Sequence, residues 1–586
     1  MNKFIIVCTM LFMVQSVHAN ANWNRTDGGA LDVAENWSNA VKPDGTTGET
    51  WLYNQQSAPL TMPTDGSMTF GETRLMGLIG TFDLGSKSKT IKMSGLHVFE
   101  DSGRASATEL VSGTISASGT VYVEDDNCSI TLNGPDAVLT SAGVQIGVGK
   151  MNCAMSVLGG ASYSGGTGNI MVGLNNRGTA DALIVSGIGS TCSIKQLHVG
   201  AGSSNCVASV LDGGTLSTSE GIYIGRDNVD NTAGTTPRPG NMLVVSNATV
   251  TQASGILYVG MSSSSNRLEI LDRGTVAAFN FRVGNDRRSE AEGKLHGNSA
   301  VVRGSGSRLT VSGDMYVGRL NSVDSEFTVA DGATMDIKGD AYIGHEANVS
   351  GSKFTVDNAV FDYAPPSAKN FIIGNYARDA SLNIVNGGRF FVTNSTATLK
   401  MGSDTSQSAS NSIIRVSSGG MFRGKSLQTG GQASSAIVVE DGDVEFSGTL
   451  YLRNYATLLV KGTNSYVNAS TINVNRPDGK PTFRVEIPPE GLVGERPLVH
   501  TANLYPFTMA STMLVVDVAE PADSVTANKT YVIFKVESGS AWSAYDLYAR
   551  TQLVGYDRAA LDYDDARGEI LLMVRPKSKG LLISFK

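Results

Sequence analysis

A short apolar strand that ends in glycine recurs through the middle of the chain, and this repeat constrains the fold more than any other feature. The ten intervals between the first and last of these glycines span 283 residues, about 28 residues each. A repeat of this length is typical of a solenoid, because one unit alone cannot bury its apolar face. The glycines are Gly147, Gly173, Gly200, Gly225, Gly260, Gly284, Gly318, Gly344, Gly374, Gly402 and Gly430.

The residues before each glycine indicate what kind of solenoid this is. The positions one and three residues before glycine are apolar throughout, apart from Thr429. The position between them is mixed, so the pattern has period two and predicts a strand with one buried face. The residues of this intermediate column are Gln145, Met171, His198, Tyr223, Tyr258, Arg282, Tyr316, Tyr342, Ile372, Lys400 and Gln428.

Two further short strands precede the glycine-terminated strand in each unit. Residues 209–216 and 382–390 both contain a short apolar strand, a turn with Gly or Asn, and another strand. Gly and Asn tolerate the positive φ of a sharp corner. The sequence therefore predicts an all-β fold, a right-handed parallel β-helix with about three strands per coil of roughly 28 residues, over residues 81–460. At ~4.8 Å per coil, roughly 13 or 14 coils give a rod on the order of 60–70 Å.

The chain ends differ from this repeat. Residues 1–19 combine Lys3, an apolar stretch and a small-residue motif that ends at Ala19, which predicts a secretory signal peptide and an extracellular or cell-surface location. No later segment is apolar for long enough to predict a transmembrane helix. We expect residues 20–80 to form an N-terminal cap and the first strands, with Trp23, Trp37 and Trp51 closing the open core. Prolines become frequent after about residue 477, so residues 461–586 are expected to form a small C-terminal β cap or attachment region.

Four cysteines follow the predicted signal peptide. Cys128 and Cys153 occupy the same phase in consecutive coils. Stacked residues lie ~4.8 Å apart, within the range that a disulfide requires. We therefore predict that Cys128 and Cys153 can form a disulfide, although four buried free thiols are an equal alternative. A bond between Cys192 and Cys206 is less well supported, because Asp181 has the phase of Cys206 in the coil before it.

The N-terminal region and the coils resemble a known kind of surface protein. The relevant residues are Trp23-Asn24, the segment Ala34-Glu35-Asn36-Trp37-Ser38-Asn39 with Pro43, and coils of the form Leu257-Tyr258-Val259-Gly260. They resemble autotransporter passenger-like proteins with autotransporter-associated β-strand repeats. The resemblance implies a right-handed β-helix displayed at a bacterial cell surface. The residues after the repeats are too few for the full-length C-terminal membrane barrel of that family, so the C-terminal region is expected to serve another anchoring system.

The sequence contains no arrangement that predicts chemistry. The five histidines that follow the predicted signal peptide are scattered in phase, so each, including His198, is expected to be solvated. The acidic pair Asp125-Asp126 has no matching carboxylate in the next coil, and no calcium-binding, Gly-x-Ser-x-Gly or His-Glu-x-x-His motif occurs. We predict no catalytic residue, no metal site and no cofactor, and the net charge of −8 gives no reason to expect a nucleic-acid partner.

Binding is expected on the surface of the coils. The outward column brings together Tyr223, Tyr258, Arg282, Tyr316 and Tyr342. They either form an aromatic ladder that stabilises the sheet, worth ~0.2–1 kcal/mol per pair, or a stacking strip for glycan rings. Polar turns after the glycines, at 226–242 and 285–294, are a second candidate edge.

Two functions remain from the sequence. The favoured one is an exported cell-surface scaffold, structural or adhesin-like, whose partners are polysaccharides or cell-envelope components. The alternative is a surface polysaccharide lyase or glycoside hydrolase, which would place two or more carboxylates from neighbouring coils along one cleft.

Overall fold

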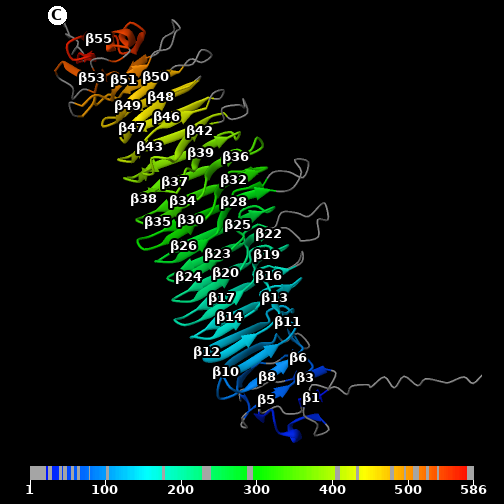
Figure 1. Ribbon diagram of the computed structural model, residues 1–586. Coiled ribbons are helices and arrows are strands. Elements are labelled where there is room, and N and C mark those ends of the chain that lie inside the picture. Colours follow the sequence, from blue (N-terminus) through cyan, green and yellow to red (C-terminus); the bar gives the residue numbers. More distant parts are fainter. Residues whose placement is uncertain are drawn as a thin grey trace, which may run out of the picture.

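The chain forms one long parallel β-solenoid, seen here in a computed structural model (Figure 1). Each turn of the solenoid has roughly 26 residues, and the turns stack ~4.8 Å apart. The turn is shorter than the 28-residue estimate because two of the glycine intervals, of 35 and 34 residues, contain the long segments 227–238 and 287–294. The structure describes residues 21–576 except 24–28, 39–42, 44–48, 54–58, 63–65, 78, 101–104, 175–178, 227–238, 287–294, 403–409, 431–433, 454, 475–480, 494–495, 506–513, 523–526, 538–539 and 541. The predicted signal peptide and most of the two polar turns, residues 227–238 and 287–294, lie outside the described residues.

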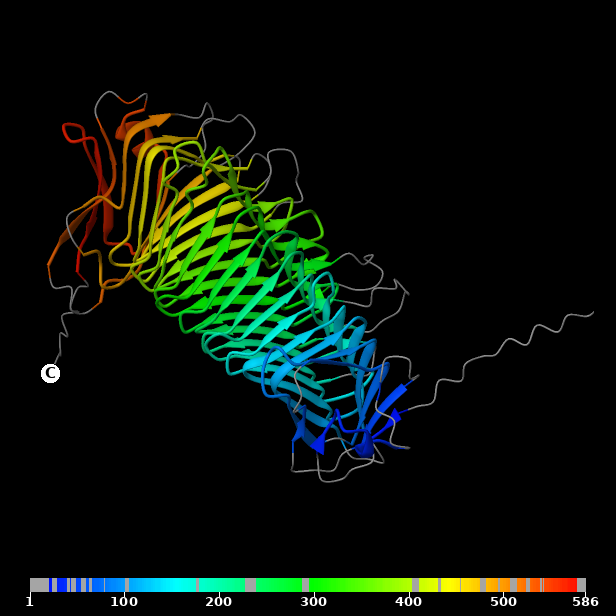
Figure 2. The ribbon, with the colours of Figure 1, turned by 60° about the horizontal axis from the view of Figure 1, so that its bottom comes forward.

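Three strands per turn build three faces around the core. We call them faces 1, 2 and 3 in chain order within a turn. Figure 2 shows the stack of turns tilted, with its N-terminal end brought forward. Face 1 contains β2 (Gly29–Ala30), β4 (Leu60–Thr61), β7 (Ile79–Asp83), β14 (Ala154–Leu158), β17 (Ala182–Ser186), β20 (Val207–Leu211), β23 (Met242–Ser246), β26 (Arg267–Leu271), β30 (Ser299–Arg303), β34 (Glu326–Ala330), β37 (Lys353–Asp357), β40 (Ser381–Val385), β43 (Ser412–Ser417), β46 (Ser435–Glu440), β48 (Ala456–Lys461), β50 (Thr482–Ile487), β52 (Leu514–Val518) and β54 (Thr551–Gly555).

The other two faces have the same parallel order. Face 2 contains β5 (Ser67–Thr69), β8 (Thr90–Met93), β15 (Ser162–Ser164), β18 (Thr191–Ile194), β21 (Thr215–Thr218), β24 (Thr249–Gln252), β27 (Thr275–Ala278), β31 (Arg308–Val311), β35 (Thr334–Ile337), β38 (Val360–Asp362), β41 (Arg389–Phe391), β44 (Met421–Gly424) and β53 (Lys529–Val536). Face 3 contains β1 (Ala21–Asn22), β3 (Glu49–Tyr53), β6 (Glu72–Met76), β9 (Gly95–Phe99), β11 (Thr120–Val123), β13 (Gly143–Val148), β16 (Ile170–Leu174), β19 (Leu197–Ala201), β22 (Ile222–Arg226), β25 (Ile256–Met261), β28 (Asn280–Asp286), β32 (Met315–Leu320), β36 (Ala341–His345), β39 (Asn370–Asn375), β42 (Thr398–Met401) and β45 (Leu427–Thr429).

Five longer strands bend around a corner and belong to two faces. β10 (Ala107–Ala117) and β12 (Ser129–Thr140) join face 1 to face 2, and β47 (Asp443–Tyr451), β49 (Tyr466–Asn473) and β51 (Val499–Tyr505) join face 2 to face 3. A separate two-stranded sheet, β29 (Leu295–His296) with β33 (Ser322–Val323), lies outside the faces.

The register confirms the columns predicted from the glycine repeat. On face 3, Ile222 pairs with Leu257 and Ile224 pairs with Val259, and all four are buried. Because apolar columns stack on themselves, a slip of one residue would turn each column outward. Between Leu84 and Ala278 the core is mainly aliphatic, with Tyr163 as its one aromatic member among the described residues, and it becomes rich in phenylalanine from Phe281 onward.

A buried polar column explains why glycine ends the strands of face 3. In each turn, the residue at the start of the face 1 strand points inward at the corner, and we call these residues the corner column. Its members are Cys128, Cys153, Asp181, Cys206, Asn241, Asn266, Asn298, Ser325, Ser352, Ala380, Ser412 and Ser435. Gly225 has φ +69°, and a Cβ there would overlap the side chain of Asn266. Gly260 stands in the same relation to Asn298. Both of these glycines are thus fixed by their backbone conformation and by a polar side chain one turn further on.

The two ends close the rod differently. At the N-terminus a 3₁₀ helix, η1 (Ala34–Asn36), precedes Trp37, which packs edge-on against Trp23 with ring centroids 5.1 Å apart. Trp51 does not join this cap; it lies on the outward column of face 3 beneath Arg74, which corrects the expectation that three tryptophans close the core.

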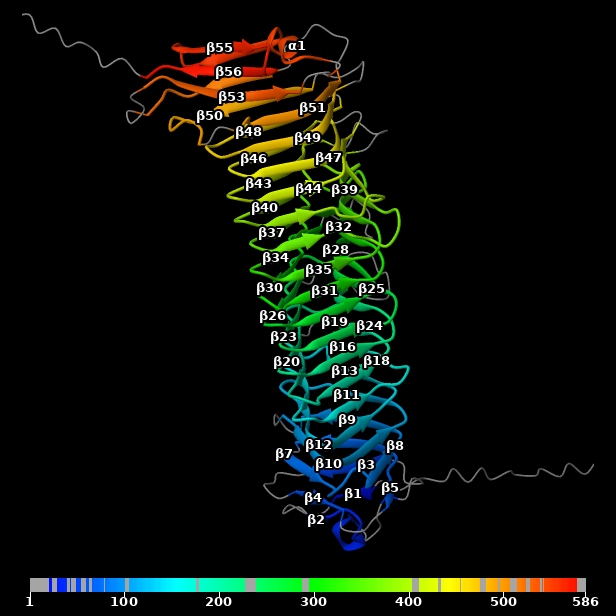
Figure 3. The same ribbon diagram turned by 60° about the vertical axis from the view of Figure 1, so that its left-hand side comes forward.

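At the other end the parallel stack continues past residue 460, through β48, β50, β52 and β54. An antiparallel unit of β53, β55 (Ala559–Asp564) and β56 (Glu569–Val574) covers the last turn with α1 (Ala544–Tyr548) (Figure 3). None of the helices in the described ranges is long and apolar enough to cross a membrane.

Candidate functional site

The outward column of face 3 brings the five predicted binding residues together. Tyr223, Tyr258, Arg282, Tyr316 and Tyr342 lie on β22, β25, β28, β32 and β36, and each pairs with the next. They form one continuous row along the rod axis.

The aromatic rings of this row face one another. Tyr223 and Tyr258 stack with centroids 5.5 Å apart, and Tyr316 and Tyr342 stack at 4.9 Å. Arg282 lies between the two pairs, its Cζ 5.5 Å from the ring of Tyr258 and 5.2 Å from that of Tyr316. Ring faces that pack against neighbours leave edges and hydroxyl groups for a ligand. The arrangement has the geometry of a stabilising ladder with cation–π contacts.

Two members of the outward column are buried. His198, expected to be solvated, is 1% exposed, and Tyr258 is 3% exposed. His198 stacks on Tyr223 at 4.7 Å, and its Nε2 lies 3.1 Å from Oε1 of Gln196. Burial, with a smaller contribution from Arg226, lowers the pKa of His198 to about 4. The imidazole is therefore neutral at physiological pH and acts as part of the ladder.

The cysteines fall in two separate columns. Cys128 and Cys153 follow each other in the corner column, both fully buried and both free thiols. Sγ of Cys153 donates to the carbonyl of Asp125 at 2.9 Å. Cys192 lies on face 2 between Tyr163 and Leu216, whereas Cys206 belongs to the corner column, so these two do not stack.

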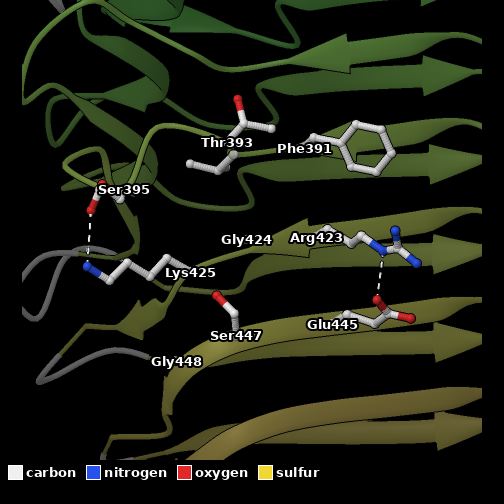
Figure 4. A pocket seen from close by; sticks show the side chains of 10 residues that line it. Phe391, Thr393, Ser395, Arg423, Gly424, Lys425, Glu445, Ser447 and Gly448 are labelled. Atoms are coloured by element: carbon white, nitrogen blue, oxygen red, sulfur yellow. Dashed lines mark hydrogen bonds and ion pairs between the residues drawn. The ribbon is translucent and has the colours of Figure 1, made fainter.

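A groove that the sequence did not reveal crosses three turns of face 2 near the C-terminal end of the rod; we call it the basic groove (Figure 4). Its volume is about 610 Å³. One side is a column in which Phe391, Arg423 and Glu445 are paired on β41, β44 and β47. The other residues that line it are Val392, Thr393, Ser395, Gly424, Lys425, Ser447 and Gly448.

The basic groove presents cationic donors to solvent. Nε of Arg423 donates to Glu445 at 2.7 Å, and the two terminal nitrogens of this guanidinium make no hydrogen bond to any described residue. Nζ of Lys425 donates to the neutral carbonyl of Ser395 at 3.3 Å and, within the described part of the chain, has no carboxylate partner. A guanidinium with free terminal nitrogens can bind a carboxylate with two parallel hydrogen bonds. An ammonium group and a partly exposed aromatic ring lie in the same groove.

The sequence carried a signal for this groove. Phe391, Arg423 and Glu445 each stand three residues after a corner glycine, at Gly388, Gly420 and Gly442. Tracking the phase of face 2 from these glycines would have aligned the three side chains. Only the outward column of face 3 was searched for binding residues, so these three residues were not predicted.

A second polar cluster lies near the N-terminal end of the rod. His97 on β9 is held between two carboxylates, with Nδ1 2.6 Å from Oε1 of Glu124 and Nε2 2.5 Å from Oε1 of Glu72. The hydrogen bond to Glu124 is the largest cause that raises the pKa of His97; burial opposes it and Glu72 adds to it. The three groups come from successive turns, and the ring also stacks on Tyr122 at 4.7 Å. His97 is thus part of an ion-pair network rather than free in solvent.

Comparison with known proteins does not assign the chain to a family. No protein-family model, no curated protein and no solved structure matches it. Within the described ranges, no group of three or more His, Cys, Asp or Glu side chains is arranged to hold a metal ion. The function is therefore inferred from the geometry of the sites themselves.

Proposed function

We propose that this chain is an exported cell-surface scaffold, of the autotransporter passenger-like kind, that binds acidic polysaccharide along a rigid rod. The predicted signal peptide and the resemblance of the repeats support the location. The continuous stack of parallel strands supports the scaffold role, because each turn fixes the side chains of the next.

The observation that carries the binding proposal is the set of unused cationic donors in the basic groove. Arg423 is paired with Glu445 through Nε and keeps its two terminal nitrogens as donors, while the ammonium of Lys425 has no carboxylate partner within the described chain. Phe391 adds an aromatic ring in the same column. Uronic acid polymers combine carboxylates with sugar rings that have apolar faces, so they match both kinds of group.

Affinity electrophoresis in gels that contain polygalacturonate or alginate tests this proposal. We expect the polymer to retard the mature chain. The affinity of Arg423→Ala for the polymer should be about tenfold lower, because one charged hydrogen-bonding group is lost. Arg303→Ala is the matched control, since this arginine is also exposed and paired with a carboxylate, Asp331, but lies outside the groove. Equal retardation of the chain and Arg423→Ala would contradict the proposal.

The tyrosine row of face 3 is the competing location for glycan binding. Replacing Tyr223, Tyr258, Tyr316 and Tyr342 by serine should lower stability and leave polysaccharide retention unchanged, because the ring faces already pack on one another. If this variant still folds, judged by circular dichroism, and the polysaccharide no longer retards it, glycan binding would be assigned to the tyrosine row.

One observation favours the alternative, a surface polysaccharide lyase or glycoside hydrolase. Glu72 and Glu124, from neighbouring turns, both contact His97, which gives acid and base groups within hydrogen-bond distance of each other. Release of reducing or unsaturated sugar ends by the mature chain, abolished in Glu124→Gln, would establish this activity. Turnover that persists in Glu124→Gln would exclude His97 and its partners as its source.

A further inference from the structure

Face 2 carries a second groove, toward the N-terminal half of the rod, that differs in chemistry from the basic groove. Its floor is a column of hydroxyl side chains, Ser164, Ser193, Ser217 and Thr251, on the consecutive strands β15, β18, β21 and β24. The volume is about 420 Å³, and none of the described residues that line it is charged. We call it the hydroxyl groove. Figure 3 places β18 and β24 on the same side of the rod.

The hydroxyl groups of this groove are available to a ligand. Ser164 and Ser193 are exposed, and their hydroxyls make no hydrogen bond to another described residue. Thr251 donates to the hydroxyl of Ser217 at 3.0 Å, which leaves the Thr251 oxygen free to accept. The same chemical group therefore recurs at every turn, spaced by ~4.8 Å.

A buried amide adds an unsatisfied donor. Gln252, which lines the groove, is 6% exposed, and its Nε2 has no hydrogen-bond partner. Leaving a buried donor without a partner lowers the stability of the fold. Such a group is therefore unusual unless a ligand or water satisfies it.

The oxygen of this amide connects the groove to the backbone of the next turn, at a residue with an exposed aromatic ring. Oε1 of Gln252 accepts a hydrogen bond from the backbone N–H of Phe279 at 3.3 Å. Phe279 lies in the next turn and is 43% exposed. An exposed aromatic ring next to a row of hydroxyl groups is the combination that sugar recognition uses: the ring stacks on the face of a sugar, and the hydroxyls form hydrogen bonds.

We propose that the hydroxyl groove binds an uncharged polysaccharide that lies along the rod axis, with one sugar ring on Phe279. A polymer in this direction meets a hydroxyl at each turn, and the neutral lining matches a neutral chain because no charge is desolvated. The proposal extends the proposed function to a second site and a second class of ligand, and it does not require the basic groove to bind.

Affinity electrophoresis of the full mature chain in gels with hydroxyethylcellulose, galactomannan or dextran tests the site. Phe279→Ala should weaken retention by at least one of these neutral polymers about tenfold. Ser193→Glu, which places a charge in the groove, should weaken it at least as much. Tyr455→Ala and Thr69→Glu are the matched controls, because Tyr455 is an exposed aromatic elsewhere and Thr69 is an exposed hydroxyl on face 2 outside the groove. Both controls should behave as the unmodified chain.

The same gels separate this proposal from the basic groove. Arg423→Ala should leave retention by the neutral polymers unchanged, and Phe279→Ala should leave retention by polygalacturonate unchanged. The hydroxyl groove is rejected if no neutral polymer retards the chain, if Phe279→Ala and Ser193→Glu are retained like the unmodified chain, or if Arg423→Ala alone abolishes neutral binding. If polygalacturonate does not retard the chain but a neutral polymer does, the basic groove is rejected as a binding site and the hydroxyl groove is retained.

Discussion

The corner column provides the most direct test of how the solenoid is held together, through the substitution Asn266→Ala. Asn266 is fully buried, and its Oδ1 accepts from the backbone N–H of Asn241 at 3.3 Å and from Nδ2 of Asn241 at 3.1 Å. Its own Nδ2 donates to Oδ1 of Asn298 at 3.0 Å and to Oγ of Ser263 at 2.6 Å. Removing this amide takes an acceptor away from two buried donors.

The expected cost follows from those two donors. At about 1–3 kcal/mol for each buried donor that loses its acceptor, Asn266→Ala should lower the free energy of unfolding by about 2–6 kcal/mol. Ser325→Ala is the matched control in the same column. Oγ of Ser325 is buried and has no hydrogen-bond partner, so its removal should be neutral or stabilising by up to about 1 kcal/mol.

Urea denaturation followed by circular dichroism measures both free energies, and hydrogen exchange at the Asn241 amide adds a local measurement that does not assume two-state unfolding. We expect a lower urea midpoint and faster exchange at Asn241 for Asn266→Ala only. A loss below 1 kcal/mol for Asn266→Ala, or an equal loss for Ser325→Ala, would refute the role of the buried amide column.

Three further predictions concern titration and oxidation. Burial raises the pKa of Asp181 from 3.8 to about 7, so its ionisation opposes folding as the pH rises between these values. Asp181→Asn should therefore be about 2–4 kcal/mol more stable than the unmodified chain at pH 8 and equally stable below pH 4, by urea titration at both pH values. The pKa of His97 is raised in the folded chain, so protonation of His97 stabilises the fold. This stability is fully present below the usual histidine pKa of 6.5 and is lost as the pH rises through the folded pKa. Glu124→Gln should lower the pKa of His97 in an NMR titration, and an unchanged titration would contradict the role of Glu124. Oxidation of the folded chain should join Cys128 to Cys153, and mass spectrometry without reduction that finds both as free thiols would reject the bridge.

The fold was largely predictable because a solenoid repeats its constraints. The apolar columns before each glycine are the buried columns of face 3, and the alignment of Cys128 with Cys153 follows from the same phase. The continuation of parallel pairing through β52 and β54 was not predictable, because the glycine column ends at Gly430 and later turns pair without it. A strand that lacks the repeated glycine gives only a short apolar run, which is ambiguous without its partner.

Exposure was harder to predict than position. Period two places His198 and Tyr258 on the outward column, yet both are buried. Large neighbours cause this: His198 stacks on Tyr223, and Tyr258 lies between Tyr223 and Arg282. Burial by residues one turn away depends on side-chain volumes in adjacent turns, which a strand pattern alone does not contain.

The sites depend on contacts between turns, which explains why the sequence did not reveal them. Phe279 and Gln252 are separated by 27 positions and meet only because their strands are in register. The same holds for Phe391, Arg423 and Glu445. Once the period of each face is known, such residues can be found by alignment on the corner glycines.

Binding of acidic polysaccharide without turnover is the central functional claim, and one combined measurement tests it most directly. The mature chain and Arg423→Ala are compared for retardation in polygalacturonate gels, and the same polymer is assayed for new sugar ends after incubation with each protein. We expect the polymer to retard the unmodified chain, to bind Arg423→Ala with about tenfold weaker affinity, and to gain no new sugar ends with either protein. Equal retardation of the two proteins, or release of sugar ends by the unmodified chain, would contradict it.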